Sequence, residues 1–127
     1  MTSKKSHKSS AVYLTQIQDR LQRLDRQFEH GREHFMASED AQDAAIRNLE
    51  IIGEVVKRLP LDLTALRPEI PWKQIAGFRD VAIHNYEDLI IEDVWEILKN
   101  DLKPLQEAVN AMQSALTASG DADPGSS

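Results

Sequence analysis

Three side chains suited to phosphodiester chemistry, Arg79, His84 and Tyr86, stand within the short segment 79–86. Arginine holds a phosphate through two parallel hydrogen bonds and keeps its charge, while histidine can both take and give a proton near neutral pH. Such a site needs no metal ion when the substrate is RNA, because the ribose 2′-hydroxyl supplies the nucleophile. The segment therefore predicts a ribonuclease site without a cofactor, with RNA rather than DNA as the substrate.

Each group has an expected role in this site. His84 acts as general base on the 2′-hydroxyl or as general acid on the leaving 5′-oxygen, and Arg79 stabilises the charge that develops on the phosphorus oxygens. Asp80, four residues before His84, is placed to accept a hydrogen bond from the imidazole and orient it. The alternative interpretation is a surface cluster of ion pairs at a helix end, formed by the same three residues without any activity.

Helix geometry limits how the two proposed catalytic groups can meet. On an ideal helix the directions of Arg79 and His84 differ by about 140°. Both can face one phosphate only if the helix unwinds near His84 or if a second copy of the chain completes the site. A two-fold axis would place two arginines and two histidines around one cleft, so we expect a homodimer.

Composition limits the class of protein. The chain has 127 residues, a net charge of −6 and no cysteine, which suits one domain and excludes disulfides and thiolate metal sites. The negative charge argues against broad affinity for nucleic acid, so RNA contacts must be local. No segment suits a membrane span or a signal peptide, and a cytoplasmic location is expected. The polar ends predict disordered tails at 1–10, which is basic, and 117–127, around an ordered helical domain at 11–116.

Apolar residues recur at helical spacing in the first half of the chain. A first helix is expected to end near Gly31, and a second to cover 39–58 after a turn at 32–37, with Ser38 as its N-cap. Asn48 lies beside the apolar face of the second helix, where its amide either fixes the register of a helix contact or reaches the surface. The apolar stripes of the two helices are Leu14, Ile17, Leu21, Leu24 and Phe28, then Ala45, Ile46, Leu49, Ile52, Val55 and Val56.

Prolines divide the second half. Pro60 ends the second helix and an irregular connection follows; Pro71 then marks the start of the helix that ends in the His84 region. Asp88 is the expected N-cap of the last helix, which Pro104 must kink or divide. Helices joined by short connections predict an all-α fold, an antiparallel up-and-down bundle of four to five helices.

The segment 79–86 has the form R-x-x-x-x-H-x-Y and lies among further blocks at 45–54 (AIRNLEIIGE), 70–79 (IPWKQIAGFR), 93–96 (DVWE) and 100–105 (NDLKPL). Together these blocks resemble the HepT-like branch of the HEPN superfamily, the toxin half of modules whose antitoxin is a minimal nucleotidyltransferase. The resemblance implies a HEPN-like dimeric helical bundle, an RNA-cleaving toxin, and neutralisation by the partner.

The resemblance also carries over to single residues. Arg79 and His84 match the catalytic pair of the family, and Tyr86 matches the tyrosine that the partner modifies with AMP, which would add negative charge at the cleft and repel RNA. Many relatives carry Asn after the motif arginine, whereas this chain has Asp80, an acid that can pair with Arg79 and weaken phosphate binding. Lys73 is one basic residue that the fold could bring toward the RNA.

Two other functions compete with the ribonuclease. The chain could be a non-catalytic helical binding partner of a nucleotidyltransferase, with the motif as contact surface. Alternatively, His30 and His34, four residues apart, could bind a metal ion on one helical face. Gly31 between them weakens a helix, and the order of residues differs from that of a metalloprotease.

Overall fold

The computed structural model describes residues 3–84 and 90–119, and for 3–8, 79, 81–84 and 119 it describes the backbone alone. These residues form helices and no strand, so the all-α prediction is confirmed. Five helices are long and two, α2 and α4, are single short turns within the predicted connections. The helices are α1 (Ser3–Glu29), α2 (Arg32–Ala37), α3 (Glu39–Val56), α4 (Leu61–Thr64), α5 (Trp72–His84), α6 (Ile91–Asn100) and α7 (Leu102–Ser119).

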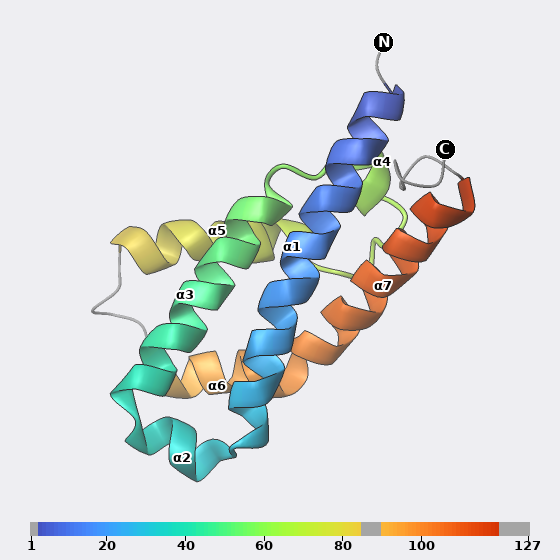
Figure 1. Cartoon of the computed structure of the whole chain (residues 1–127). Coiled ribbons are helices and arrows are strands. Elements are labelled where there is room, and N and C mark those ends of the chain that lie inside the picture. The colour runs from blue at the N-terminus through green and yellow to red at the C-terminus, as the bar shows by residue number, and fades with distance from the viewer. Residues whose placement is uncertain (1–2, 85–89, 120–127) are drawn as a thin grey trace.

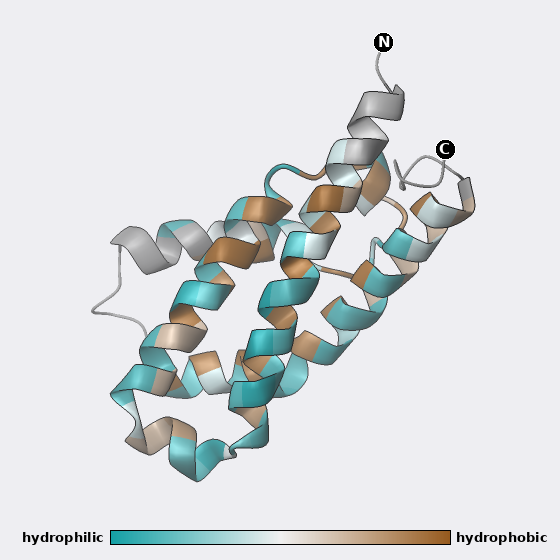
Figure 2. Cartoon of the chain, in the orientation of Figure 1, coloured by the Kyte–Doolittle hydropathy of each residue, from teal (hydrophilic) through white to brown (hydrophobic). Residues whose placement is uncertain are grey.

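The centre of the bundle is α1, which lies between α3 and α7 (Figure 1). The predicted apolar stripe of α1 is buried from Leu14 to Leu24, and that of α3 is buried from Ala45 to Val56. In Figure 2, hydrophobic and hydrophilic residues alternate along α1, α3 and α7, as expected for helices that each bury one face. The hydrophobic pattern of the sequence therefore located the core correctly.

The first helix begins earlier than the sequence indicated. The predicted start of the ordered domain, residue 11, falls inside α1, whose backbone is helical from Ser3. Ser10 is already 1% exposed. Once a helix has nucleated, adding a further turn needs no new apolar contact, so composition alone places such a boundary poorly. At the other end, α7 continues to Ser119, and residues 120–127 lie outside the described part of the chain.

A short helix replaces the turn predicted between α1 and α3, and that prediction was wrong. Phe35 of α2 is fully buried, and its ring lies 5.4 Å from that of Trp95, which also stacks on Phe28 at 5.0 Å. This aromatic cluster stabilises a helical turn too short to form alone. Gly31, with φ of 91°, makes the sharp connection into α2. The predicted cap is confirmed, because the Ser38 side chain accepts a hydrogen bond from the Ala41 amide.

The connection after Pro60 is more regular than predicted, since it opens with the one-turn helix α4. Leu63 of α4 is buried, and this packing holds the turn in place. Pro71 was expected at the first helical position and instead directly precedes α5, where its carbonyl accepts a hydrogen bond from the Ile75 amide. The helix that carries the motif therefore begins within one residue of its expected start, and its backbone is helical through His84.

Pro104 divides the last helical segment, one of the two outcomes expected. Helix α6 ends at Asn100 and α7 starts at Leu102, so Pro104 stands in the first turn of α7, where its missing N–H is not needed. The predicted N-cap was wrong: Asp88 lies outside the described residues, and Ile90 occupies the cap position of α6 without a side-chain hydrogen bond. Within 3–84 and 90–119, no helix is both long and apolar enough to cross a membrane.

Candidate functional site

Helix α5 positions the predicted site, and its N-terminal half is anchored. The indole Nε1 of Trp72 donates a 2.9 Å hydrogen bond to the Arg67 carbonyl, which fixes the start of the helix. Further along, Ile75, Ala76 and Phe78 pack against the hydrophobic core. The main neighbour of α5 is α3, which it crosses in Figure 1. The second half of α5 carries the motif.

The backbone of α5 is helical through His84, the last residue of the helix. Arg79 lies in its second half, and the side chains of both residues fall outside the described part of the structure. On a regular helix the two positions are about 140° apart around the axis. Unwinding before His84, one of the two arrangements expected from the sequence, is therefore not observed. Tyr86, the predicted AMP acceptor, lies outside the described residues.

Asp80 is the motif residue whose contacts the structure describes. Lys57 Nζ donates hydrogen bonds to the Asp80 carboxylate, at 3.3 Å from Oδ1 and 3.4 Å from Oδ2. Lys57 directly follows α3, so this ion pair joins the end of α3 to the motif helix. The sequence suggested His84 or Arg79 as a partner of Asp80, and the side chains of both lie outside the described part of the structure; it did not indicate Lys57. Lys57 continues a stripe of α3 that carries both signs of charge (Asp43, Arg47, Glu50, Glu54), and this spacing does not indicate which face of α3 meets α5.

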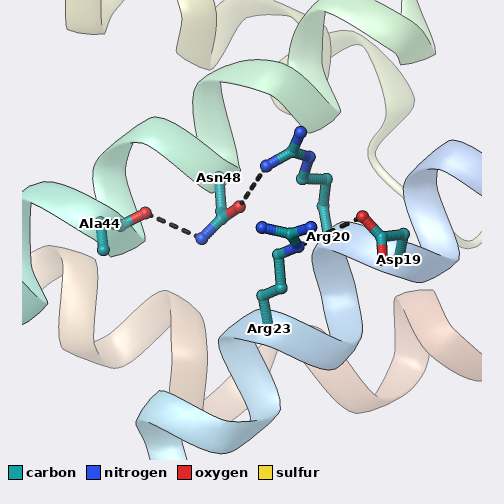
Figure 3. A network of polar contacts seen from close by, with 5 residues as sticks. All are labelled: Asp19, Arg20, Arg23, Ala44 and Asn48. Carbon is teal, nitrogen blue, oxygen red and sulfur yellow. Dashed lines mark hydrogen bonds and ion pairs between the residues drawn. The ribbon is translucent and has the colours of Figure 1, made fainter.

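A polar network joins α1 to α3 on the other side of α3 (Figure 3). Arg20 Nη1 donates a 3.2 Å hydrogen bond to Asn48 Oδ1, and Asn48 Nδ2 donates to the Ala44 carbonyl at 2.9 Å. Arg23 pairs with Asp19 nearby at 3.2 Å. Asn48 is 7% exposed, so its amide serves the α1–α3 contact instead of reaching solvent. The sequence left both possibilities open, and the role of Arg20 was not foreseen.

Two hollows flank these helices. A groove of about 810 Å³ between α1 and α3 is lined by both signs of charge, including Arg47 paired with Glu50 at 3.2 Å and Arg58 paired with Glu54 at 3.6 Å. A second hollow of about 420 Å³ lies between α5 and the α6–α7 junction, and Leu49 and Phe78 are among its mostly apolar lining. Because the groove carries both signs of charge, it does not favour a ligand of either sign. The second hollow lies along the apolar side of α5.

The histidine pair considered for metal binding lies at the α1–α2 junction. The rings of His30 and His34 are 5.1 Å apart and tilted by 43°, and both residues are exposed. His30 follows the end of α1, so the two do not share one continuous helical face as the metal hypothesis required. In the part of the chain that the structure describes, no three His, Cys, Asp or Glu residues are grouped to hold a metal ion.

Comparison with known proteins identifies a family. The model of the family described as "Ribonuclease HepT-like" matches residues 17–112. A protein of Thermococcus cleftensis named "Probable ribonuclease HepT" is 38% identical over 107 residues, which cover 81% of this chain and 92% of that protein. "Putative RNase MJ0127" of Methanocaldococcus jannaschii is 38% identical over 85 residues, 64% of this chain and 70% of the relative.

A third relative is longer. The M. jannaschii protein named "Gamma-glutamylcyclotransferase and putative RNase MJ0434" is 34% identical over 103 residues, which cover 80% of this chain and 46% of that protein. The matched region therefore occurs there within a larger polypeptide. No solved structure gives a significant match to the chain.

Proposed function

Since the chain belongs to the HepT-like family of HEPN ribonucleases, we propose that it is a metal-independent endoribonuclease whose catalytic residues are Arg79 and His84. The observation that carries the proposal is the R-x-x-x-x-H-x-Y motif at the C-terminal end of α5, a helix anchored on α3. We further propose that the protein is the toxin of a toxin–antitoxin module, neutralised when a nucleotidyltransferase transfers AMP to Tyr86.

The reaction follows from the chemistry of the two side chains. His84 removes the proton of the ribose 2′-hydroxyl, or protonates the departing 5′-oxygen, while Arg79 stabilises the negative charge on the phosphorus oxygens. The 2′-oxygen attacks the phosphorus and the bond to the 5′-oxygen breaks. The products are a 2′,3′-cyclic phosphate and a 5′-hydroxyl.

A homodimer is part of the proposal, and the regular backbone of α5 supports it. Because the helix stays regular through His84, positions 79 and 84 are on different sides of α5. A two-fold axis beside α5 allows Arg79 of one copy and His84 of the other to approach the same phosphate. The RNA then binds in the cleft between the copies.

Cleavage of RNA tests the catalytic proposal. The purified protein is incubated with total RNA in the presence of a chelator, beside Arg79→Ala, His84→Ala and the control His34→Ala, which alters an exposed histidine away from α5. We expect the wild type and the control to cleave RNA, and each motif variant to lose at least about a hundredfold in rate. A wild type without cleavage, or equal cleavage by all four proteins, contradicts the proposal. Nucleotidyltransferase binding without cleavage would instead identify a non-catalytic binding partner.

Intact mass tests the modification proposal. The protein is coexpressed with a nucleotidyltransferase encoded beside it, and a mass increase by whole AMP units is expected. The chain has two tyrosines, so Tyr86→Phe should abolish the increase and Tyr13→Phe should keep it. An AMP-sized increase that persists in Tyr86→Phe places the modification elsewhere.

A further inference from the structure

The ion pair between Lys57 and Asp80 lies inside the proposed site, although Lys57 is distant from it in the sequence. Lys57 Nζ reaches both oxygens of the Asp80 carboxylate, at 3.3 and 3.4 Å. Asp80 directly follows Arg79 and precedes His84 by one helical turn. The ammonium group of Lys57, at the end of α3, therefore contacts the start of the motif, next to Arg79.

Stability alone is a weak reason for this contact. The side chains of Lys57 and Asp80 are 38% and 54% exposed, and ion pairs of that exposure contribute little to stability. The next residue, Arg58, is also cationic and more than half exposed, yet it pairs within its own helical segment with Glu54 at 3.6 Å. Of these two adjacent cations, Lys57 is the one whose ion pair crosses to α5.

The charge balance of the motif gives the contact a second purpose. Residues 79–88 contain one arginine, Arg79, against three carboxylates, Asp80, Glu87 and Asp88. An RNA phosphate approaching Arg79 must therefore approach a segment with excess negative charge. A cation supplied by another helix lowers that repulsion, and Lys57 supplies it at the carboxylate next to Arg79.

We propose that Lys57 is a positioning residue of the Arg79–His84 site, which holds Asp80 against α3 and offsets its charge so that an RNA phosphodiester can approach Arg79. This inference rests on the proposed ribonuclease function. Lys57 acts through Asp80 and does not take part in proton transfer. Its removal therefore affects RNA binding more than the chemical step.

The experiment is a double-mutant cycle on RNA binding and cleavage. Binding is measured by fluorescence anisotropy with a short labelled RNA whose 2′-hydroxyls are methylated, so that it cannot be cleaved, and kcat and KM are measured with the unmodified RNA. The variants are Lys57→Ala, Lys57→Arg, Asp80→Asn, the double variant Lys57→Ala/Asp80→Asn, and Arg58→Ala as a matched control. Thermal unfolding of each variant checks that the fold is retained.

We expect Lys57→Ala to raise Kd and KM by about three- to fivefold and to change kcat by less than about twofold. Lys57→Arg and Arg58→Ala should stay within about twofold of the wild type. In the Asp80→Asn background, Lys57→Ala should have no further effect, because the charge that Lys57 offsets is gone.

Three results would overturn the inference. If Lys57→Ala binds RNA as the wild type does, or loses no more RNA affinity than Arg58→Ala does, the contact has no role in the site. An equal loss with and without the Asp80 carboxylate shows that Lys57 acts independently of it. If the wild type cleaves RNA, any of these three results rejects the role of Lys57 and leaves the proposed ribonuclease function intact. If the wild type neither binds nor cleaves RNA, both the ribonuclease function and the role of Lys57 are rejected.

Discussion

Arg20 on α1 donates a 3.2 Å hydrogen bond through Nη1 to Oδ1 of Asn48 on α3, and this bond fixes the register between the two helices. Asn48 also donates from Nδ2 to the Ala44 carbonyl, so both halves of its buried amide have partners. An apolar residue at this position would leave α1 and α3 free to slide on their hydrophobic faces. The buried amide therefore gives the helix pair a specific alignment.

Replacing Asn48 with alanine should lower the free energy of unfolding by about 1–3 kcal/mol, because the change removes two hydrogen bonds and leaves the Arg20 guanidinium short of a partner. Urea denaturation followed by circular dichroism measures the loss. Arg47→Ala, at the exposed neighbouring position, serves as the control and should stay within about 0.5 kcal/mol of the wild type. Equal stability of the two variants would show that the amide does not stabilise the α1–α3 contact.

The two glycines at 31 and 77 should respond to alanine in opposite directions. Among the side chains that the structure describes, none lies within 4 Å of a Cβ added at either glycine, so we expect backbone conformation to decide the effect. Gly31, with φ of 91°, should lose about 1–2 kcal/mol on substitution. Gly77 stands inside α5, and alanine there should add about 0.5–1 kcal/mol. Thermal unfolding of both variants tests this, and a loss at Gly77 would contradict it.

The aromatic cluster should be the most sensitive part of the core. Phe35→Ala removes a fully buried ring beside Trp95 and should lower the free energy of unfolding by about 3–5 kcal/mol. Phe35→Leu keeps most of the volume and should lose less, while Val12→Ala, at a residue 54% exposed, should change little. Denaturant unfolding followed by tryptophan fluorescence ranks the three. If Phe35→Ala lost no more than Val12→Ala, α2 would not depend on this contact.

A mixing experiment tests whether two copies share one site. Inactive Arg79→Ala and His84→Ala proteins are unfolded together and refolded, so that half of the dimers contain one copy of each. Each mixed dimer retains one site with both groups intact, and roughly a quarter of the wild-type cleavage should return. The control mixes Arg79→Ala with the double variant, where no activity should return. If the first mixture also stays inactive while dimers form, one copy does not complete the other.

The sequence predicted the long helices and their buried faces because each stripe, from Leu14 to Leu24 and from Ala45 to Val56, repeats at helical spacing. It missed α2 and α4, which have too few residues for a periodic pattern and depend on the burial of Phe35 and Leu63. Periodicity describes one element at a time, whereas these turns depend on contacts between elements.

The candidate site shows the same division. The sequence placed Arg79 and His84 on one helix that ends at the motif, and the structure agrees on the backbone. It did not pair Asp80 with Lys57, because 23 positions separate them and the crossing of α3 and α5 decides that contact. The catalytic roles and the AMP acceptor, Tyr86, remain predictions from the motif.

Helix α5 rests chiefly on α3 and has an apolar hollow on its α6–α7 side. The part of α5 that carries the motif is therefore supported mainly by α3, while α1 packs between α3 and α7 in the rest of the bundle. Substitutions at the contact between α1 and α7 can change the stability of the protein without altering the geometry of the site. Substitutions on the face of α3 that supports α5 change the stability and the geometry of the site together. Activity and thermal stability are therefore coupled at that face.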